Sequence, residues 1–297
     1  MSGIKLWLIP DWPAPANIHA ATILRTGGVS CGTYASLNLA THVGDIADSV
    51  KQNRQLIKAS LALPSEPVWL EQVHGNRAIQ ATNPPRSPFY KEGDWSDPFL
   101  IPPLQKGGRE DLDLQQADAS YTTERGVVCA VLTADCLPIL VCTTDGSQVA
   151  AIHVGWRGLL AGVIGNTITA MLIPPTPPFA KGGAEIVLPV LPLYKRGIEG
   201  DFLVWLGPAI GPDCFEVGAE VRDAFLEKTA EFITAFKQQE SGKWLVDIYQ
   251  LARIDLAMLG IDKVYGGGFC TVTDHQRFYS YRRDKQTGRM ATLIWRA

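Results

Sequence analysis

The chain has 297 residues, of which 46% are hydrophobic and 19% are charged, and its formal net charge is −3. This composition supplies enough apolar side chains for a large core. Without a basic excess, nucleic acid is not an expected partner, because phosphate backbones are bound mainly through Lys and Arg. Six cysteines and no CxxC pair are too few for a disulfide scaffold. The first residues lack a secretory or membrane-spanning run, so we expect a cytoplasmic protein with no membrane partner.

Apolar spacing predicts a mixture of helices and strands. The first predicted helix begins near Asp48, a candidate N-cap, and the last begins at Asp247. Between them lie runs rich in Val, Leu, Ile and Cys, which are typical of strands buried on both faces. In chain order, we expect a helix over 48–63, strands over 127–132, 138–142, 149–154 and 202–207, and helices over 216–236 and 247–261. The fold class is therefore α/β (mixed α+β), with a substantial mixed sheet flanked by helices.

Two segments differ in composition from the rest of the chain, at about 84–112 and 174–202. They contain most of the 20 prolines and share residues at a constant offset, among them Phe89 with Phe179 and Lys91 with Lys181. Their Pro and Gly content disfavours helix and central strand. We interpret them as two surface insertions in a single domain spanning 1–297 rather than as proline-rich docking motifs.

Three segments end in residues that bind soft metals. The stretch "LTADCLPIL" interrupts an apolar run with Asp135 and Cys136, while His74 lies in "LEQVHGNR" and His153 in "AIHVGWRG". One thiolate and two imidazoles suit Zn²⁺, and three protein ligands with an open fourth position are typical of a catalytic zinc. Asp135 is a candidate to orient a ligating imidazole or to place substrate. Buried structural histidines and a Cys–His nucleophile are the alternatives.

Other polar residues give weaker signals. Arg157 follows His153 at a glycine-bearing turn before a helix, where backbone N–H groups favour an anion. Arg25 and Asn38 lie in a glycine- and hydroxyl-rich segment, and Arg282, Arg283 and Arg289 lie among aromatic residues. Arginine forks suit phosphate, although for Arg289 we favour a stacked surface role. The remaining cysteines are interpreted as small buried apolar residues: Cys31, Cys129, Cys142, Cys214 and Cys270.

Six ordered motifs carry a resemblance to a known family: "WLEQVHGN", "QADASYTTERG", "VLTADCLPILV", "AIHVGWRG", "WLGPAIGPDCFEVG" and "FYSYRRDKQTGRMA". They resemble the YfiH-type purine nucleoside phosphorylases, formerly labelled multicopper polyphenol oxidases or laccase-domain proteins. The resemblance implies a mixed α/β fold and one zinc held by His74, Cys136 and His153.

It further implies phosphorolysis of adenosine, inosine, guanosine and methylthioadenosine, together with adenosine deamination. Purine nucleosides and phosphate are then the partners. We expect Arg157, Asn38, Arg25 and Gln72 to bind substrate, and His74, Cys136, His153 and Asp135 to form the catalytic centre. Glu71 and Asp135 are the candidate carboxylates for proton transfer.

Two other enzyme classes remain as alternatives. A copper-dependent polyphenol oxidase is disfavoured because the chain has only five histidines, although Cu²⁺ can replace Zn²⁺ at such ligands. A hydrolase or deamidase with Cys136 as nucleophile and His153 as base would use the same residues. Loss of activity in a metal chelator would distinguish a metal-dependent enzyme from the Cys–His hydrolase.

Overall fold

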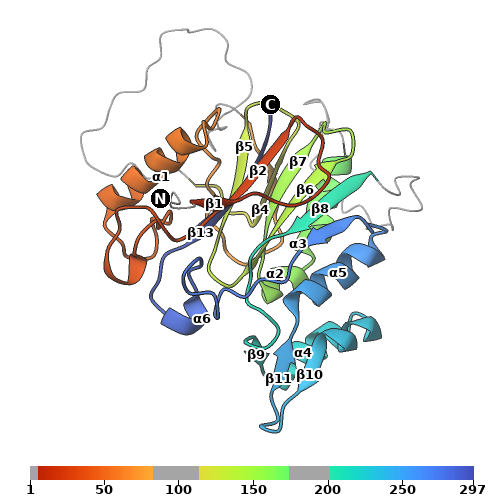
Figure 1. Cartoon of the computed structure of the whole chain (residues 1–297). Helices are drawn as coiled ribbons and strands as arrows, with labels where there is room; N and C mark the ends of the chain where they lie inside the picture. Colours follow the sequence, from red (N-terminus) through yellow and green to blue (C-terminus); the bar gives the residue numbers. More distant parts are fainter. Residues whose placement is uncertain (1–5, 83–113, 174–200) are drawn as a thin grey trace.

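The computed structural model describes residues 6–82, 114–173 and 201–297, and its centre consists of two β-sheets that lie face to face (Figure 1). The first sheet is antiparallel, and the second is mixed, with parallel pairs β12–β8 and β3–β4. In spatial order, the first sheet contains β1 (Trp7–Leu8), β2 (Ile18–Ile23), β13 (Met290–Arg296) and β5 (Val128–Thr133). The second contains β12 (Val264–Gly266), β8 (Phe202–Leu206), β6 (Leu137–Thr143), β7 (Val149–Val154), β4 (Ala119–Thr122) and β3 (Ala78–Gln80).

The central strands are apolar on both faces because both faces are covered. Along β5, Val128, Ala130 and Leu132 pack toward the outer side of the first sheet. The alternate residues Cys129 and Val131 pack between the two sheets. Side chains of a strand point alternately to opposite faces, so a continuous apolar run is required here.

Helices cover the two outer faces (Figure 1). Helix α1 (Ala47–Ser60) packs on the first sheet through Ile57. Helices α3 (Val163–Leu172) and α5 (Ile248–Met258) pack on the second sheet. The remaining elements are η1 (Gly32–Tyr34), α2 (Trp156–Leu160), β9 (Glu216–Val217), α4 (Ala219–Leu226), η3 (Ala230–Ala235), β10 (Phe236–Gln238), β11 (Trp244–Val246) and α6 (Tyr281–Asp284). Within the described ranges, every helix is too short or too polar to cross a bilayer.

The structure confirms the mixed α/β class, the four predicted strands and the helices near 48–63 and 247–261. Asp247 is the N-cap of α5, where its carboxylate accepts a hydrogen bond from the Gln250 backbone N–H. Asp48 is not a cap: the N-cap of α1 is Ile46, and Asp48 lies in the first turn, where its charge still complements the helix dipole.

The predicted helix over 216–236 is right only in part, because α4 and η3 lie within it but do not form one continuous helix. Its first residues form β9, which pairs with β11, and Gly218 then begins the short helix α4. Thr229 caps a separate 3-10 helix. Pairing with a distant strand overrides the local helical spacing here.

The remaining sequence predictions about the fold concern the two insertions and the cysteines. The insertions at 84–112 and 174–202 lie outside the described residues, apart from the last two positions of the second one, where β8 begins at Phe202. Cys129 and Cys142 are buried as expected, whereas Cys31 is exposed and Cys214 and Cys270 are partly exposed. For these last three, the interpretation as buried apolar residues was wrong.

Candidate metal and substrate site

The Asp-Cys pair lies where the chain crosses from one sheet to the other. Strand β5 of the first sheet ends at Thr133, and β6 of the second begins at Leu137. Asp135 has a φ of +98°, in the left-handed region. Its carboxylate accepts hydrogen bonds from the Thr271 hydroxyl and the Arg282 backbone N–H, both at 2.6 Å. Asp135 therefore anchors the crossing, and this leaves Cys136 at the shared end of the two sheets.

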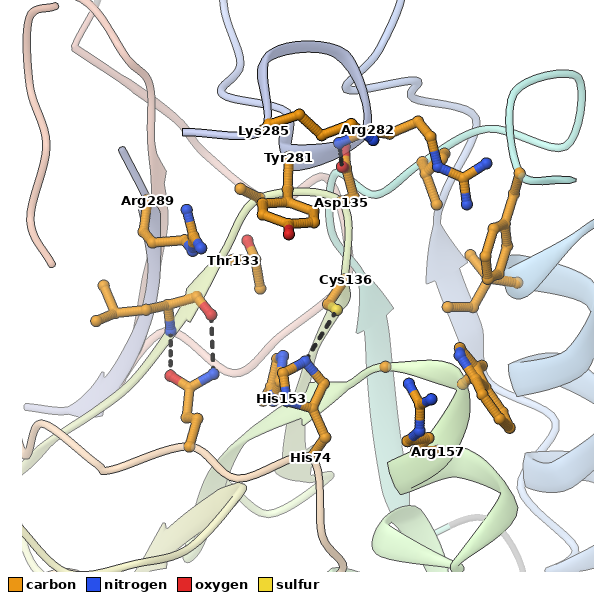
Figure 2. A pocket seen from close by; sticks show the side chains of 18 of the residues that line it. His74, Thr133, Asp135, Cys136, His153, Arg157, Tyr281, Arg282, Lys285 and Arg289 are labelled. Carbon is orange, nitrogen blue, oxygen red and sulfur yellow. Dashed lines mark hydrogen bonds between the residues drawn. The ribbon is translucent and has the colours of Figure 1, made fainter. Parts of the chain in front are cut away.

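The three predicted ligands meet at this end (Figure 2). His74 comes from the loop before β3, Cys136 from the crossing, and His153 from the end of β7. Their ligand atoms all lie within 4.8 Å of one another, and Cys136 Sγ lies 3.7 Å from His74 Nε2. His74 is exposed, Cys136 is partly exposed and His153 is buried. A thiolate and two imidazoles with one open side fit a catalytic zinc, so the residues present suit the metal that the sequence predicted.

Asp118 holds two of the three ligands, although we did not predict a role for it. This buried carboxylate accepts a hydrogen bond from His153 Nδ1 at 2.8 Å, which leaves Nε2 free for a metal. It also accepts hydrogen bonds from the backbone N–H groups of His74 at 2.9 Å and Gly75 at 2.6 Å. Carboxylates commonly orient metal-binding histidines in this way. The sequence feature that could have suggested this role is the charged residue Asp118 in "QADAS", directly before a buried strand.

Glycine at position 155 leaves room for two of the candidate ligands to come close together. A Cβ atom added to Gly155 would lie 3.0 Å from His74 Cδ2 and 3.2 Å from Cys136 Sγ. Both distances are shorter than ordinary contacts of a Cβ atom, so the ligands would have to move.

The electrostatics favour a thiolate at Cys136. Burial raises the pKa of this thiol, but hydrogen bonds and charges from His153 and His74 outweigh burial and lower the pKa to about 6. Burial lowers the pKa of His153, while Asp118 and Cys136 raise it to about 9. The thiolate that a metal requires is thus already stabilised by the residues around it.

A cavity of about 670 Å³ opens over this group. Aromatic and cationic side chains form its wall, and the cavity is large enough for a nucleoside. Arg157 lies over the Trp156 ring at 4.3 Å, and Arg282 over Phe215 at 5.8 Å. The other lining residues on which the argument depends are Gln72, Thr133, Asp135, Tyr281, Lys285 and Arg289.

The structure brings only some of the predicted substrate residues to this cavity. Arg157 and Gln72 line it. The Gln72 side chain donates to the Leu132 carbonyl at 2.8 Å and accepts from the Leu132 N–H at 2.7 Å, so it fastens the end of β5. Asn38 and Arg25 are not among the lining residues. Arg25 donates to the Ala35 carbonyl instead.

Asn38 acts behind the wall. It is fully buried, and its carbonyl oxygen accepts a hydrogen bond from the Arg289 backbone N–H at 2.9 Å. Arg289 itself lines the cavity and makes no stacking contact with an aromatic ring among the described residues, so its predicted role as a stacked surface residue was wrong. Burial lowers the pKa of Arg289, against the charges of Cys136 and Asp135, which raise it.

Asp118, rather than Asp135, accepts the hydrogen bond from the His153 ring. Asp135 accepts hydrogen bonds from Thr271 and the Arg282 backbone and lines the cavity, so its other suggested role, placing substrate, stays a prediction. Glu71, the other candidate carboxylate, does not line the cavity.

Two face-to-face sheets carry a His-Cys-His group that could hold a metal ion, under a cavity of about 670 Å³, and this combination defines a candidate enzyme site. The family model described as multi-copper polyphenol oxidoreductase laccase matches residues 19–177 and 193–297, and the chain belongs to this family.

Curated relatives are named for a different reaction. The chain is 43% identical over 288 residues to purine nucleoside phosphorylase YfiH of Escherichia coli, covering 97% of this chain and 98% of the relative. A Neisseria meningitidis protein of known structure is 41% identical, with a TM-score of 0.77 and coverage of 98% and 99%. The structure of YlmD from Geobacillus stearothermophilus is 28% identical, with a TM-score of 0.79 and coverage of 100% and 98%.

Proposed function

We propose that the protein is a zinc-dependent purine nucleoside phosphorylase that cleaves adenosine, inosine or guanosine with phosphate. The observation that carries this proposal is the group of His74, Cys136 and His153 at the floor of a cavity with a cationic wall. Relatives named purine nucleoside phosphorylase support it.

His74, Cys136 and His153 would hold the metal, and bound zinc would supply a Lewis acid beside the reacting atoms. Phosphorolysis requires phosphate to attack C1′ of the ribose as the base leaves, so the site must position an anion and stabilise developing positive charge on the sugar. The guanidinium of Arg157, held on Trp156, offers donors to substrate oxygens. Phe215 and Tyr281 supply aromatic surface for a purine.

Two finer activities belong to the same proposal. Methylthioadenosine fits the chemistry because the apolar side of the cavity, with Ile210, Phe215 and Ile248, suits a thioether. Adenosine deamination would require a group that relays a proton to the leaving ammonia. The carboxylate of Asp135 already accepts two hydrogen bonds. We therefore assign it to anchoring the crossing next to Cys136 rather than to this proton relay.

A second candidate rests on one contact. Cys136 Sγ lies 3.7 Å from His74 Nε2, and the lowered pKa of Cys136 favours a nucleophilic thiolate. A metal-free hydrolase or deamidase would use Cys136 as nucleophile and His153 as base, and both His153 and His74 lower the pKa of the thiol. The polyphenol oxidase activity in the family description has less support, because five histidines in the whole chain are few for several coppers.

The test compares metal-free and zinc-loaded protein on adenosine and inosine, with and without phosphate. Equal amounts of free base and ribose 1-phosphate, formed only with both zinc and phosphate, would support the proposal. Hydrolysis that persists in a chelator would instead support the Cys–His hydrolase. Adenosine converted to inosine by the zinc-loaded protein would establish the deaminase activity.

A further inference from the structure

One hydroxyl in the wall of the cavity has no hydrogen-bond partner. Thr133 is 1% exposed, lines the cavity, and its Oγ1 has no partner within the part of the chain that the structure describes. A buried hydroxyl without a partner costs free energy, so such a group in a wall points to a ligand that completes it. Figure 2 shows Thr133 between Arg289 and Cys136.

Arg289 presents unused donors at the same part of the wall. Its Nη1 donates to the carbonyls of Thr287 at 2.9 Å and Gly288 at 3.1 Å, and Asn38 holds its backbone N–H. These bonds fix the guanidinium, while Nε and Nη2 have no partner among residues 6–82, 114–173 and 201–297. Met290, the next residue in the chain, pairs with Thr133 across β13 and β5, and Arg289 lines the same cavity as Thr133 and Cys136.

The chemistry of this wall favours an anion. Arg289 can only donate, and a hydroxyl beside it can donate a further hydrogen bond. Lys285 lines the same cavity, and the only carboxylate among the described residues that line it is Asp135, which already accepts two hydrogen bonds. A ligand with several acceptor oxygens and negative charge satisfies this wall, whereas a purine edge presents donors as well as acceptors.

We propose that Thr133 and Arg289 form the subsite for inorganic phosphate, beside the metal centre and separate from Arg157. This inference rests on the proposed function, because it names the residues that hold the second substrate of phosphorolysis. Asn38 is then a positioning residue that acts through the Arg289 backbone.

The experiment uses the full-length zinc-loaded protein. Thr133→Val removes the hydroxyl at almost constant volume, and Thr133→Ser retains a hydroxyl. Ser120→Ala is the control, because Ser120 is also buried with an unpartnered hydroxyl but does not line the cavity and makes no contact with Arg289 among the described residues. Arg289→Gln removes the charge. The measurements are the KM for phosphate, the KM for inosine, zinc content, and the calorimetric Kd of inorganic phosphate without nucleoside.

We expect Thr133→Val to raise the phosphate KM and Kd about tenfold, and Arg289→Gln to raise them about 30-fold or more, as loss of one neutral and one charged hydrogen-bonding group implies. In all of these variants the KM for inosine and the zinc content should stay within about threefold of wild type. In Thr133→Ser and Ser120→Ala, the phosphate KM and Kd should also stay within about threefold.

A tenfold change in the inosine KM with unchanged phosphate constants would overturn the subsite, as would a loss of phosphate binding in Arg157→Gln alone. If the wild type binds phosphate, Thr133→Val weakens that binding, and no nucleoside is cleaved, the subsite stands and the proposed function fails. If nucleoside is cleaved and Thr133→Val leaves both phosphate constants unchanged, the function stands and the subsite fails.

Discussion

Asp118 is the residue on which the geometry of the ligands depends most. One carboxylate fixes the His153 ring and the backbone of the His74 loop. We predict that Asp118→Asn weakens zinc binding by about 10- to 100-fold, as loss of a residue that orients a metal ligand does elsewhere. Competition with a chromophoric chelator measures this affinity. Asp262→Asn, at an exposed position, serves as the control, and equal zinc affinities would refute the role of Asp118.

Gly155 lies against two of the candidate ligands, His74 and Cys136. A methyl group there would meet two of the ligands at 3.0 and 3.2 Å, so Gly155→Ala should displace His74 or Cys136 and reduce the zinc content of the purified protein. Gly165→Ala in α3 is the matched control, because its Cβ would meet nothing closer than 3.8 Å. The control should keep one zinc per chain and be as stable as wild type or more so, by up to about 1 kcal/mol. A full zinc complement in Gly155→Ala would contradict the argument.

The sequence was sufficient to single out His74, Cys136 and His153 as candidate ligands because each combines a metal-binding side chain with a turn beside an apolar segment. Asp118, Thr133 and Arg289 were missed as site residues for another reason. Their roles depend on which strands become neighbours, and β5 and β13 lie far apart in the chain, although Thr133 pairs directly with Met290. Spacing along one segment contains no information about that pairing.

Among the elements, α5 carries a carboxylate that destabilises the fold when it is ionised. Burial raises the pKa of Asp255 from 3.8 to about 6, against the charge of Lys228, which lowers it. The native state therefore binds this proton more tightly than the unfolded state does. The cost of ionisation is absent below about pH 4, grows as the pH rises through 6, and is complete above that value.

Asp255→Asn should therefore stabilise the protein at pH 8 by about 1–2 kcal/mol, a figure reduced from the full shift because the side chain is partly exposed. At pH 4 the variant and the wild type should be equally stable. Urea unfolding at both pH values measures the difference. A variant that is less stable at pH 8 would show that the Asp255 carboxylate makes a favourable interaction.

The difference between predicted and observed elements follows from the sheets. Strands buried on both faces have a strong apolar signal, so β5 to β8 were predictable within a residue or two. The segment 216–236 has helical spacing, but β9 pairs with β11 and the helix is confined to α4. Short edge strands of this kind are defined by their partners rather than by their own residues.

In the molecule as a whole, the candidate metal site connects both sheets and the loop that carries His74. A zinc ion bound there should stabilise the native state, because the three ligands are brought together only by folding. Free zinc at 100 times its Kd should add about 2.7 kcal/mol to the free energy of unfolding. Calorimetry of stripped and reloaded protein tests this. Cys136→Ala should lose the zinc-dependent increase in Tm, and an unchanged increase would place the zinc elsewhere.

The central claim is that nucleoside cleavage depends on zinc at His74, Cys136 and His153 and on phosphate. The most direct measurement follows hypoxanthine and ribose 1-phosphate released from inosine by protein of known zinc content, before stripping, after stripping and after addition of one equivalent of zinc. We expect equal amounts of both products, no product from the stripped protein, and recovery with zinc. Cleavage at the same rate by stripped protein, or release of hypoxanthine without phosphate, would contradict it.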